Sequence, residues 1–221
     1  MALALPPLYP ILDSAFFPAD PATCDRYLTE MVHVLTDAGV TLLQLRMKGA
    51  AAPAILHAAH VLHAASPPSL RLILNDAAPL LAASGFHGVH LGQADMPVAQ
   101  ARAALGSDVL IGISTHTLAQ LEQGGASSAD YIATGPVFAT GSKADAEPHI
   151  GLDGVRLARG VTARPLVAIG GITPYNAESV RDAGADSLAV IGAIFAQPGT
   201  RSAASPAEAG RLAADFLKLF R

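Results

Sequence analysis

Two aspartates, Asp76 and Asp95, each come shortly after a short apolar run, LILN in one case and GVHL in the other. Their carboxylate oxygens suit Mg²⁺, which proteins commonly hold with one or two carboxylates together with the phosphate oxygens of a substrate. No spacing of Cys and His residues in the sequence is typical of a zinc site. Arg46, Lys48 and Lys143 carry positive charges that could neutralise phosphate oxygens. These residues predict a site for a diphosphate bound to magnesium.

Two glycine-containing segments, AIGGIT and VIGAIF, place Gly170, Gly171 and Gly192 directly after apolar runs. Backbone N–H groups at such turns, together with the start of a short helix, attract a phosphate, and glycine lets the phosphate approach closely. The alternative is that these glycines serve only tight turns that need a positive φ. The pair of segments favours a phosphate site. A diphosphate and a monophosphate in one site would suit a reaction in which a nucleophile displaces diphosphate.

These residues follow short apolar runs that alternate along the chain with alanine-rich stretches. Runs such as LLQL and LVAI are apolar at nearly every position, which is typical of parallel strands covered on both faces. We expect strands at Leu8–Leu12, Thr41–Arg46, Leu70–Asn75, Gly88–Leu91, Leu110–Ser114, Tyr131–Thr134, Leu166–Ile169 and Ser187–Ile191. We expect helices at Asp25–Ala38, Ala51–Ala65, Ala77–Ala83, Val98–Leu105, Leu118–Gln123, Leu152–Ala158, Asn176–Ala183 and Pro206–Leu219.

Eight strands in alternation with helices predict an α/β protein with a single (β/α)8 TIM barrel, in which residues 1–221 form one domain. The competing architecture is an open, doubly wound sheet. That fold usually has a glycine-rich turn after its first strand, whereas the first expected strand here is followed by DSAFFPADP. No linker or block of charge marks a second domain.

Active-site residues of a TIM barrel lie at the carboxyl ends of its strands. The expected strand ends carry many polar residues or glycines: Gln44, Arg46, Lys48, Asn75, Asp76, His90, Gln93, Asp95, Ser114, His116, Thr140, Ser142, Lys143, Gly170, Gly171, Ile191 and Gly192. Any one of them could have a local role; Asp76, for example, could cap a helix that starts at Ala77. Polar groups at so many strand ends favour one shared site.

The histidines need separate interpretations. His57, His60 and His63 are three residues apart along one expected helix, so they fan across about 120° and cannot converge on one metal ion. We interpret them as a solvated helix face. His116 could hydrogen-bond a ligand or could shape its own loop.

Composition excludes several classes of protein. Hydrophobic residues make up 51% of the chain and charged residues 14%, which excludes a disordered chain. The net charge of −4 argues against a nucleic-acid partner. No apolar run reaches the roughly 18 residues of a membrane helix, and the start MALALPPLYPILDS lacks the basic region of a signal peptide. Cys24 is the single cysteine, so it has no internal disulfide partner. We expect a cytoplasmic protein with small-molecule partners.

Several motifs occur together in a defined order. They are QLRMK at 44–48, LILND at 72–76, GVHLGQAD at 88–95, IGIST at 111–115, DYIATGPVFATGSK at 130–143, VAIGGIT at 167–173 and AVIGAIF at 189–195. Together they resemble the thiamine-phosphate synthase family of TIM-barrel enzymes over nearly the whole chain. The resemblance implies an enzyme that joins 4-amino-2-methyl-5-(diphosphooxymethyl)pyrimidine to a thiazole phosphate, usually its carboxylated form, and releases diphosphate (and carbon dioxide) to give thiamine phosphate. It also implies a dissociative reaction, in which diphosphate leaves before the thiazole nitrogen captures a pyrimidinylmethyl cation.

The resemblance implies roles for individual residues. Asp76 and Asp95 match the family's ligands for Mg²⁺. The residues that match its pyrimidine-diphosphate site are Gln44, Leu45, Arg46, Met47, Lys48, Asn75, Ser114 and Lys143. The residues that match its thiazole-phosphate site are Thr140, Gly141, Ser142, Gly171, Ile191 and Gly192. Among all of these, Lys48, Ser114 and Lys143 are expected to take part in catalysis.

The chain departs from the family's pattern at several positions. Ser142 stands where the family usually has Thr, and Gly192 stands where it often has Ser. Ala77 removes a positive charge that the family commonly has near the diphosphate, and the first strand ends in ILD instead of VTD. None of these changes removes an expected magnesium ligand. Two alternatives stay open: a thiazole tautomerase-like barrel, which tends to lack QLRxK and the paired aspartates, and a non-catalytic barrel that binds a phosphate ligand.

Overall fold

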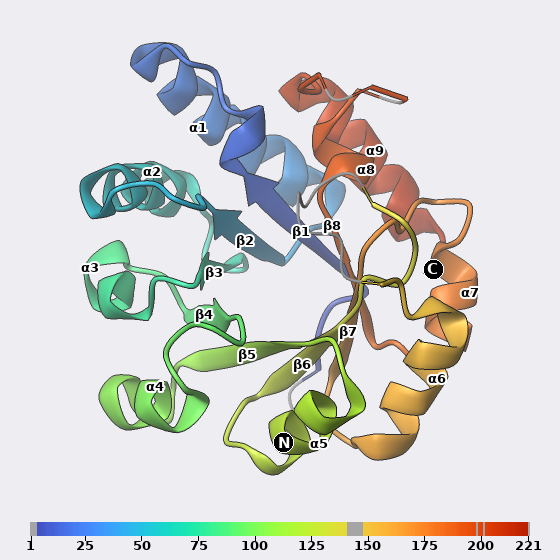
Figure 1. Ribbon diagram of the computed structural model, residues 1–221. Helices are drawn as coiled ribbons and strands as arrows, with labels where there is room; N and C mark the ends of the chain where they lie inside the picture. Colours follow the sequence, from blue (N-terminus) through green and yellow to red (C-terminus); the bar gives the residue numbers. More distant parts are fainter. Residues whose placement is uncertain (1–3, 141–147, 198, 201, 221) are drawn as a thin grey trace.

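The chain forms a closed barrel of parallel strands. The computed structural model describes residues 4–140, 148–197, 199–200 and 202–220. Within these residues eight strands pair in chain order, and β8 closes the ring against β1, where Leu8 is in register with Leu188. The strands occupy the centre and the helices surround them (Figure 1). The predicted (β/α)8 barrel is confirmed, and the open-sheet alternative is wrong.

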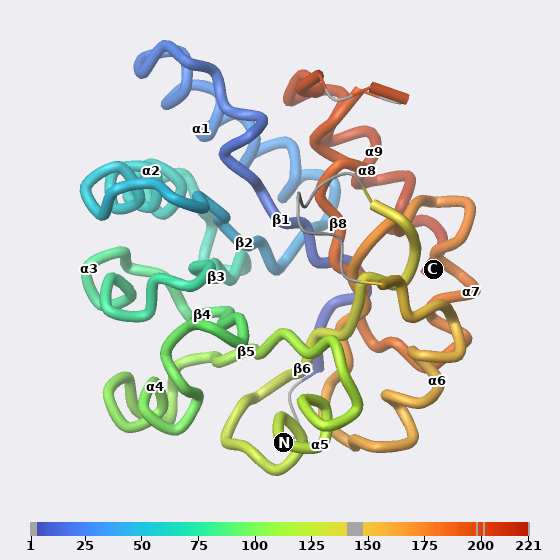
Figure 2. The backbone as a smooth tube through the Cα atoms, viewed as in Figure 1, coloured from blue at the N-terminus to red at the C-terminus, as the bar shows by residue number. Residues whose placement is uncertain are grey.

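The strands agree closely with those expected from the apolar runs. They are β1 Leu8–Asp13, β2 Leu42–Arg46, β3 Arg71–Asn75, β4 Gly88–Leu91, β5 Leu110–Thr115, β6 Tyr131–Thr134, β7 Leu166–Ile169 and β8 Ser187–Val190. The chain winds around the barrel in one direction, so that the last strand returns to lie beside the first (Figure 2). The differences from expectation are confined to one residue at the end of a strand.

The helices differ from expectation mainly where they are short. They are η1 Ser14–Phe16, α1 Pro21–Ala38, α2 Ala52–Ala65, η2 Ala78–Leu80, α3 Leu81–Ser84, α4 Val98–Leu105, α5 Leu118–Ala126, α6 Gly151–Val161, α7 Ala177–Asp182, α8 Gly192–Phe195 and α9 Pro206–Lys218. The helix expected at Ala77–Ala83 is instead a 3-10 turn followed by one α-helical turn, because Asp76 and Ala77 have non-helical backbones. Within the described ranges, no helix is both long enough and apolar enough to cross a membrane.

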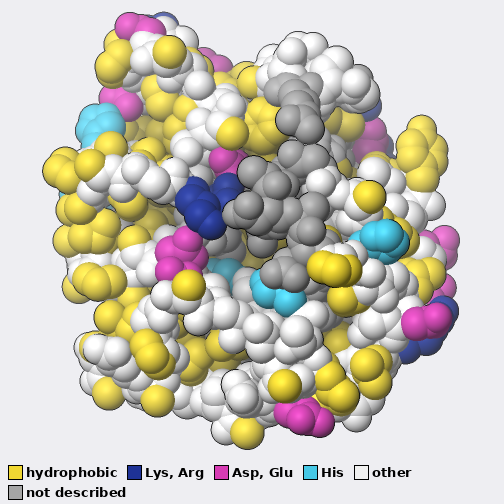
Figure 3. All heavy atoms as spheres, in the orientation of Figure 1, with side chains coloured by type: hydrophobic (Ala, Val, Ile, Leu, Met, Phe, Trp, Pro, Cys, Tyr) yellow, Lys and Arg dark blue, Asp and Glu magenta, His cyan; other side chains and the backbone are white. Residues whose placement is uncertain are grey.

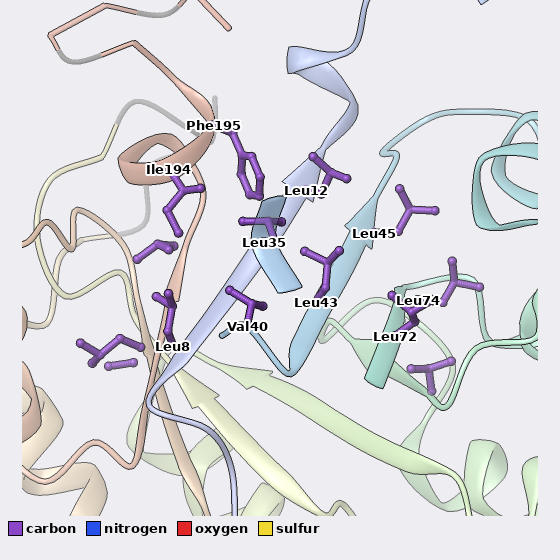
Figure 4. Packing of buried hydrophobic residues seen from close by; sticks show 14 of the residues in the cluster. Leu8, Leu12, Leu35, Val40, Leu43, Leu45, Leu72, Leu74, Ile194 and Phe195 are labelled. Atoms are coloured by element: carbon purple, nitrogen blue, oxygen red, sulfur yellow. The ribbon is translucent and has the colours of Figure 1, made fainter. Parts of the chain in front are cut away.

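Apolar side chains pack in two layers, one on each side of the barrel wall. In the outer layer, Leu43 and Leu45 of β2 lie near Leu35 of α1 (Figure 4). In the inner layer, Leu42 of the same strand packs with Ile73 and other side chains inside the barrel. Both faces of each strand are therefore buried, which explains why the strands are apolar at nearly every position. Each fully buried leucine stabilises the fold by about 2 kcal/mol.

Gly112 of β5 leaves room inside the barrel for a large ring on the next strand. Gly112 is in register with Tyr131 of β6, and a Cβ atom at position 112 would overlap the Tyr131 ring. Tyr131 is completely buried and packs edge-on against Tyr9 of β1, with the ring centroids 6.0 Å apart. The interior of the barrel is thus fitted around two tyrosines.

We expect Gly112→Ala to destabilise the protein by about 3 kcal/mol, because the new methyl group must push the Tyr131 ring or the barrel wall out of place. The free energy of unfolding, measured in urea, checks this. Gly160→Ala in α6 is the matched control, since a Cβ atom there meets no other atom within 4 Å. The control should be neutral or stabilising by up to about 1 kcal/mol. Equal stabilities for the two variants would contradict the packing argument.

Candidate active site

The carboxyl ends of all eight strands meet at one face of the barrel, because the strands are parallel. Lys and Arg side chains lie beside Asp and Glu side chains near the centre of this face (Figure 3). The predicted site residues that lie at this rim and are described are Arg46, Lys48, Asn75, Asp76, Asp95, Ser114, Thr140, Gly171, Ile191 and Gly192. Gly141, Ser142 and Lys143 lie outside the described residues.

Asp76 and Asp95 lie together at the rim, after β3 and β4 respectively. The Asp95 carboxylate is near enough to that of Asp76 to raise its pKa. The backbone N–H of Gly92 donates to Oδ2 of Asp95 at 2.7 Å, and this bond fixes the second carboxylate. Asp76 has a φ of 62°, which is uncommon for a residue with a side chain, and its N–H donates to the carbonyl of His90 at 2.8 Å. The following turn has Ala77 as its N-cap, so the alternative role of Asp76 as a helix cap is wrong.

Burial, and after it the neighbouring Asp95, raise the pKa of Asp76 to about 6 although Lys48 and Arg46 act to lower it. A pair of carboxylates with this property binds a proton readily when no cation is present. Among the described residues, no group of three or more His, Cys, Asp or Glu side chains could hold a metal ion. A pair of carboxylates fits Mg²⁺, which completes its octahedral shell with water and phosphate oxygens.

Arg46 is held in place by an acidic partner on the neighbouring strand. Its guanidinium forms an ion pair with Oδ2 of Asp13, which is 5% exposed. Asp13 ends β1 and is in register with Arg46 at the end of β2, and its Oδ1 accepts a hydrogen bond from the N–H of Ala15 at 2.9 Å. The sequence pattern gave Asp13 no role, and it was quoted only as the last residue of ILD. An acid and a base at the ends of two consecutive strands were the available signal for this pair.

A continuous chain of hydrogen bonds crosses the interior of the barrel. Nε2 of Gln44 donates to the hydroxyl of Tyr9 at 2.8 Å, and that hydroxyl lies 2.9 Å from the hydroxyl of Tyr131. The Tyr131 hydroxyl lies 3.1 Å from Nδ1 of His90, whose Nε2 lies 2.8 Å from Oγ of Ser114. We call these five residues the interior chain. Burial raises the pKa values of both phenols, so both keep their protons at neutral pH.

Sequence analysis missed both tyrosines of the interior chain. Tyr9 and Tyr131 are separated by 122 positions, so no local spacing relates them. The available signal was the position of a polar aromatic residue within an apolar strand whose neighbour carries a glycine, Gly112.

Gly170 and Gly171 follow β7 with φ values of 104° and 65°. A Cβ atom on Gly171 would lie 2.7 Å from the carbonyl oxygen of Ala139, and the N–H of Phe138 donates to the carbonyl of Gly170 at 3.0 Å. The glycines therefore allow the loop after β7 to lie against the segment after β6. This is the turn interpretation of the two glycines, and it is compatible with a phosphate at the same place. Ile191 is the N-cap of α8, which begins at Gly192.

Two predicted site residues have side chains that point away from the rim. Leu45 is 1% exposed and packs in the outer apolar layer (Figure 4), and Met47 packs partly against the same layer. A ligand at the rim would meet them only through their backbone. The imidazole of His116 contacts the segment after the neighbouring strand β6, since its Nδ1 lies 2.7 Å from the carbonyl oxygen of Gly135.

Thiamine-phosphate synthases are among the known proteins that the chain is similar to. The sequence profile described as thiamine monophosphate synthase matches residues 9–194. A thiamine-phosphate synthase of Koribacter versatilis is 46% identical over 200 residues, which are 90% of this chain and 94% of that protein. A thiamine-phosphate synthase of Azorhizobium caulinodans is 42% identical and covers 82% of this chain and 86% of its own. A solved thiamine phosphate pyrophosphorylase from Pyrococcus furiosus superposes with a TM-score of 0.74 at 28% identity, over 95% of this chain and 96% of that one.

The raised pKa of Asp76 makes the stability of the metal-free protein depend on pH. Between the ordinary carboxyl value of 3.8 and about 6, the folded protein binds more protons than the unfolded chain, so the free energy of unfolding falls as pH rises through this window. Asp76→Asn removes the titrating carboxyl group, so the free energy of unfolding no longer falls through this window on its account. In EDTA, we expect the variant to be more stable than the parent by about 1 kcal/mol at pH 7, after allowance for the partial exposure of the group, and equally stable near pH 4.

Urea unfolding at the two pH values provides the measurement. Asp182→Asn, an exposed acid on α7, is the control and should show no such change with pH. A stability difference between Asp76→Asn and the parent that is the same at both pH values would contradict the assignment.

Proposed function

The chain belongs to the thiamine monophosphate synthase family, and we propose that it is a thiamine-phosphate synthase whose reaction takes place at the carboxyl rim of the barrel. It is a transferase of thiamine biosynthesis, and it joins a pyrimidine diphosphate to a thiazole phosphate with release of diphosphate. The observation that carries the proposal is the pair Asp76 and Asp95 beside the positive charges of Lys48 and Arg46. A tautomerase-like or non-catalytic barrel would not need these paired carboxylates.

Asp76 and Asp95 are the residues that would hold Mg²⁺ in this proposal. When bound, the ion supplies positive charge to the diphosphate oxygens and so makes diphosphate a better leaving group. The fixed position of Asp95, through the N–H of Gly92, supports a role as a preorganised ligand.

The remaining rim residues bind and orient the pyrimidine diphosphate. Lys48 is exposed at the rim and can reach phosphate oxygens, while the guanidinium of Arg46 is held near the same place by Asp13. Asn75 ends β3, Ser114 is the penultimate residue of β5, and Gln44 lies in the middle of β2. Diphosphate departs with the electron pair of its C–O bond, and the thiazole nitrogen then forms the new C–N bond. The residues therefore act by holding the two partners in line and by stabilising negative charge on the leaving group.

The thiazole phosphate occupies the opposite part of the rim, at the ends of β6, β7 and β8. Thr140, Gly171 and the Ile191–Gly192 backbone are the described residues that would bind its phosphate, and Ser142 and Lys143 are expected to join the site. The close approach of the loop after β7 to Ala139 supports this placement, because it brings two of these segments into contact.

The direct test of the proposed function is incubation of the protein with the pyrimidine diphosphate, thiazole phosphate and Mg²⁺, followed by detection of thiamine phosphate. We expect Asp76→Asn and Asp95→Asn to lower kcat by about 100-fold or more, because each removes charge that acts on the leaving group. Asp182→Asn should keep the parent kcat. Undiminished turnover in both rim variants at saturating substrates and Mg²⁺ would refute the metal assignment.

Gly171→Ala tests the thiazole-phosphate site. The new Cβ would press on Phe138 and Ala139 and displace the segment after β6. We expect KM for the thiazole phosphate to rise about tenfold while KM for the pyrimidine diphosphate changes less than about twofold. Gly199→Ala is the control, since Gly199 has a similar φ of 75° but a Cβ there meets no atom within 4 Å. Equal effects on the two KM values would count against the placement.

A further inference from the structure

We propose that Tyr9, Tyr131 and His90 are positioning residues that act on the pyrimidine diphosphate through Gln44 and Ser114, the two ends of the interior chain. The inference rests on the proposed function, because it takes those two ends as substrate-binding groups. The three middle residues, Tyr9, Tyr131 and His90, are buried and belong to β1, β6 and β4. The two end residues, Gln44 and Ser114, belong to β2 and β5. One hydrogen-bonded path therefore couples two separate contacts with one substrate.

The burial of the interior chain argues that it does more than fill space. Tyr9 is 1% exposed, Tyr131 is 0% exposed and Gln44 is 2% exposed. Buried polar groups that hydrogen-bond to one another add little net stability compared with apolar side chains of the same shape. The barrel nevertheless makes room for the Tyr131 ring by having a glycine at position 112. The ring of His90 also stacks on that of Tyr131, with centroids 5.6 Å apart, which fixes the imidazole plane.

The number of protons available in the interior chain decides which atom donates and which accepts in each of its hydrogen bonds. Nε2 of Gln44 donates to Tyr9, so the single proton of the Tyr9 hydroxyl is available for the oxygen of Tyr131. The Tyr131 hydroxyl then donates to Nδ1 of His90, which leaves the imidazole proton on Nε2. That proton is donated to Oγ of Ser114. In this arrangement every oxygen and nitrogen of the path has one defined role.

The direction decides what the two ends offer to a ligand. Because Oγ of Ser114 accepts from His90, its own proton can be donated to the substrate. Because the amide of Gln44 donates through Nε2, its Oε1 is the acceptor and suits an N–H of an amino group. A diphosphate ester of an aminopyrimidine has both an amino donor and acceptor atoms. The interior chain thus selects the hydrogen-bonding pattern of that substrate and not of the thiazole phosphate.

Tyr131→Phe tests the proposal, because it removes one oxygen and interrupts the path at its middle. We expect kcat/KM for the pyrimidine diphosphate to fall about tenfold, mainly through KM, while KM for the thiazole phosphate stays within about twofold of the parent. Tyr9→Phe, which leaves the Tyr131–His90–Ser114 part intact, should have a smaller effect on the same parameter. The effects of the two substitutions should be less than additive, since both act on one path.

Tyr27→Phe is the matched control. Tyr27 is a buried tyrosine of α1 whose hydroxyl has no hydrogen-bond partner among the described residues. Its removal should leave both KM values unchanged. If Tyr131→Phe and Tyr9→Phe kept the parent KM for the pyrimidine diphosphate, or raised both KM values equally, the positioning role would be overturned while the function itself stood.

Nitrogen-15 NMR of the histidine rings gives a readout that does not depend on activity. His90 of the ligand-free protein should be neutral with its proton on Nε2, and its signal is identified by its loss in His90→Gln. The Nδ1 shift should change in Tyr131→Phe and stay nearly the same in Tyr9→Phe and Tyr27→Phe. A proton on Nδ1 in the parent would overturn the direction of the chain. If the parent made no thiamine phosphate, the proposed function would fail, and the NMR result would still decide whether the chain exists as described.

Discussion

Closure of the barrel is the constraint on which everything else depends. The pairing of β8 with β1 turns a parallel sheet into a ring without free edges, and it aligns the carboxyl ends of strands that begin almost 180 residues apart. Asp13 near one end of the chain and Ile191 near the other consequently belong to the same rim. A site made of single residues from many strands can exist only because the closed barrel fixes the positions of those residues along the barrel axis.

Closure also creates an interior that must be filled. Most of that volume contains aliphatic side chains such as Ile73 and Val167. The two tyrosines carry polar atoms up from this apolar region towards the rim, where Gln44 and His90 meet them. A layer of hydrogen-bonded side chains inside the barrel therefore lies between the apolar interior and the residues of the proposed site.

Much of the fold and part of the site follow from local sequence pattern. Continuous apolar runs indicated all eight strands, and the residues just after them indicated the rim, including the neighbouring carboxylates of Asp76 and Asp95. Short helices such as α3 and α8 were harder to foresee, since a single turn has no periodicity to detect. The Asp13–Arg46 ion pair and the Tyr9–Tyr131 contact depend on strand register, which a linear reading does not contain. The side-chain direction of Leu45 could have been inferred, because it alternates with Gln44 along β2.

The fit of Gly112 against Tyr131 has a consequence for how this sequence can change. A side chain at position 112 and a tyrosine at position 131 exclude each other, so position 112 cannot gain a side chain without loss of stability while position 131 is tyrosine. A relative that carries alanine or a larger residue at the first position should carry a smaller or differently shaped residue at the second. Substitutions at positions 112 and 131 would then occur together. A relative without the glycine at position 112 would therefore also lack the tyrosine hydroxyl group at position 131.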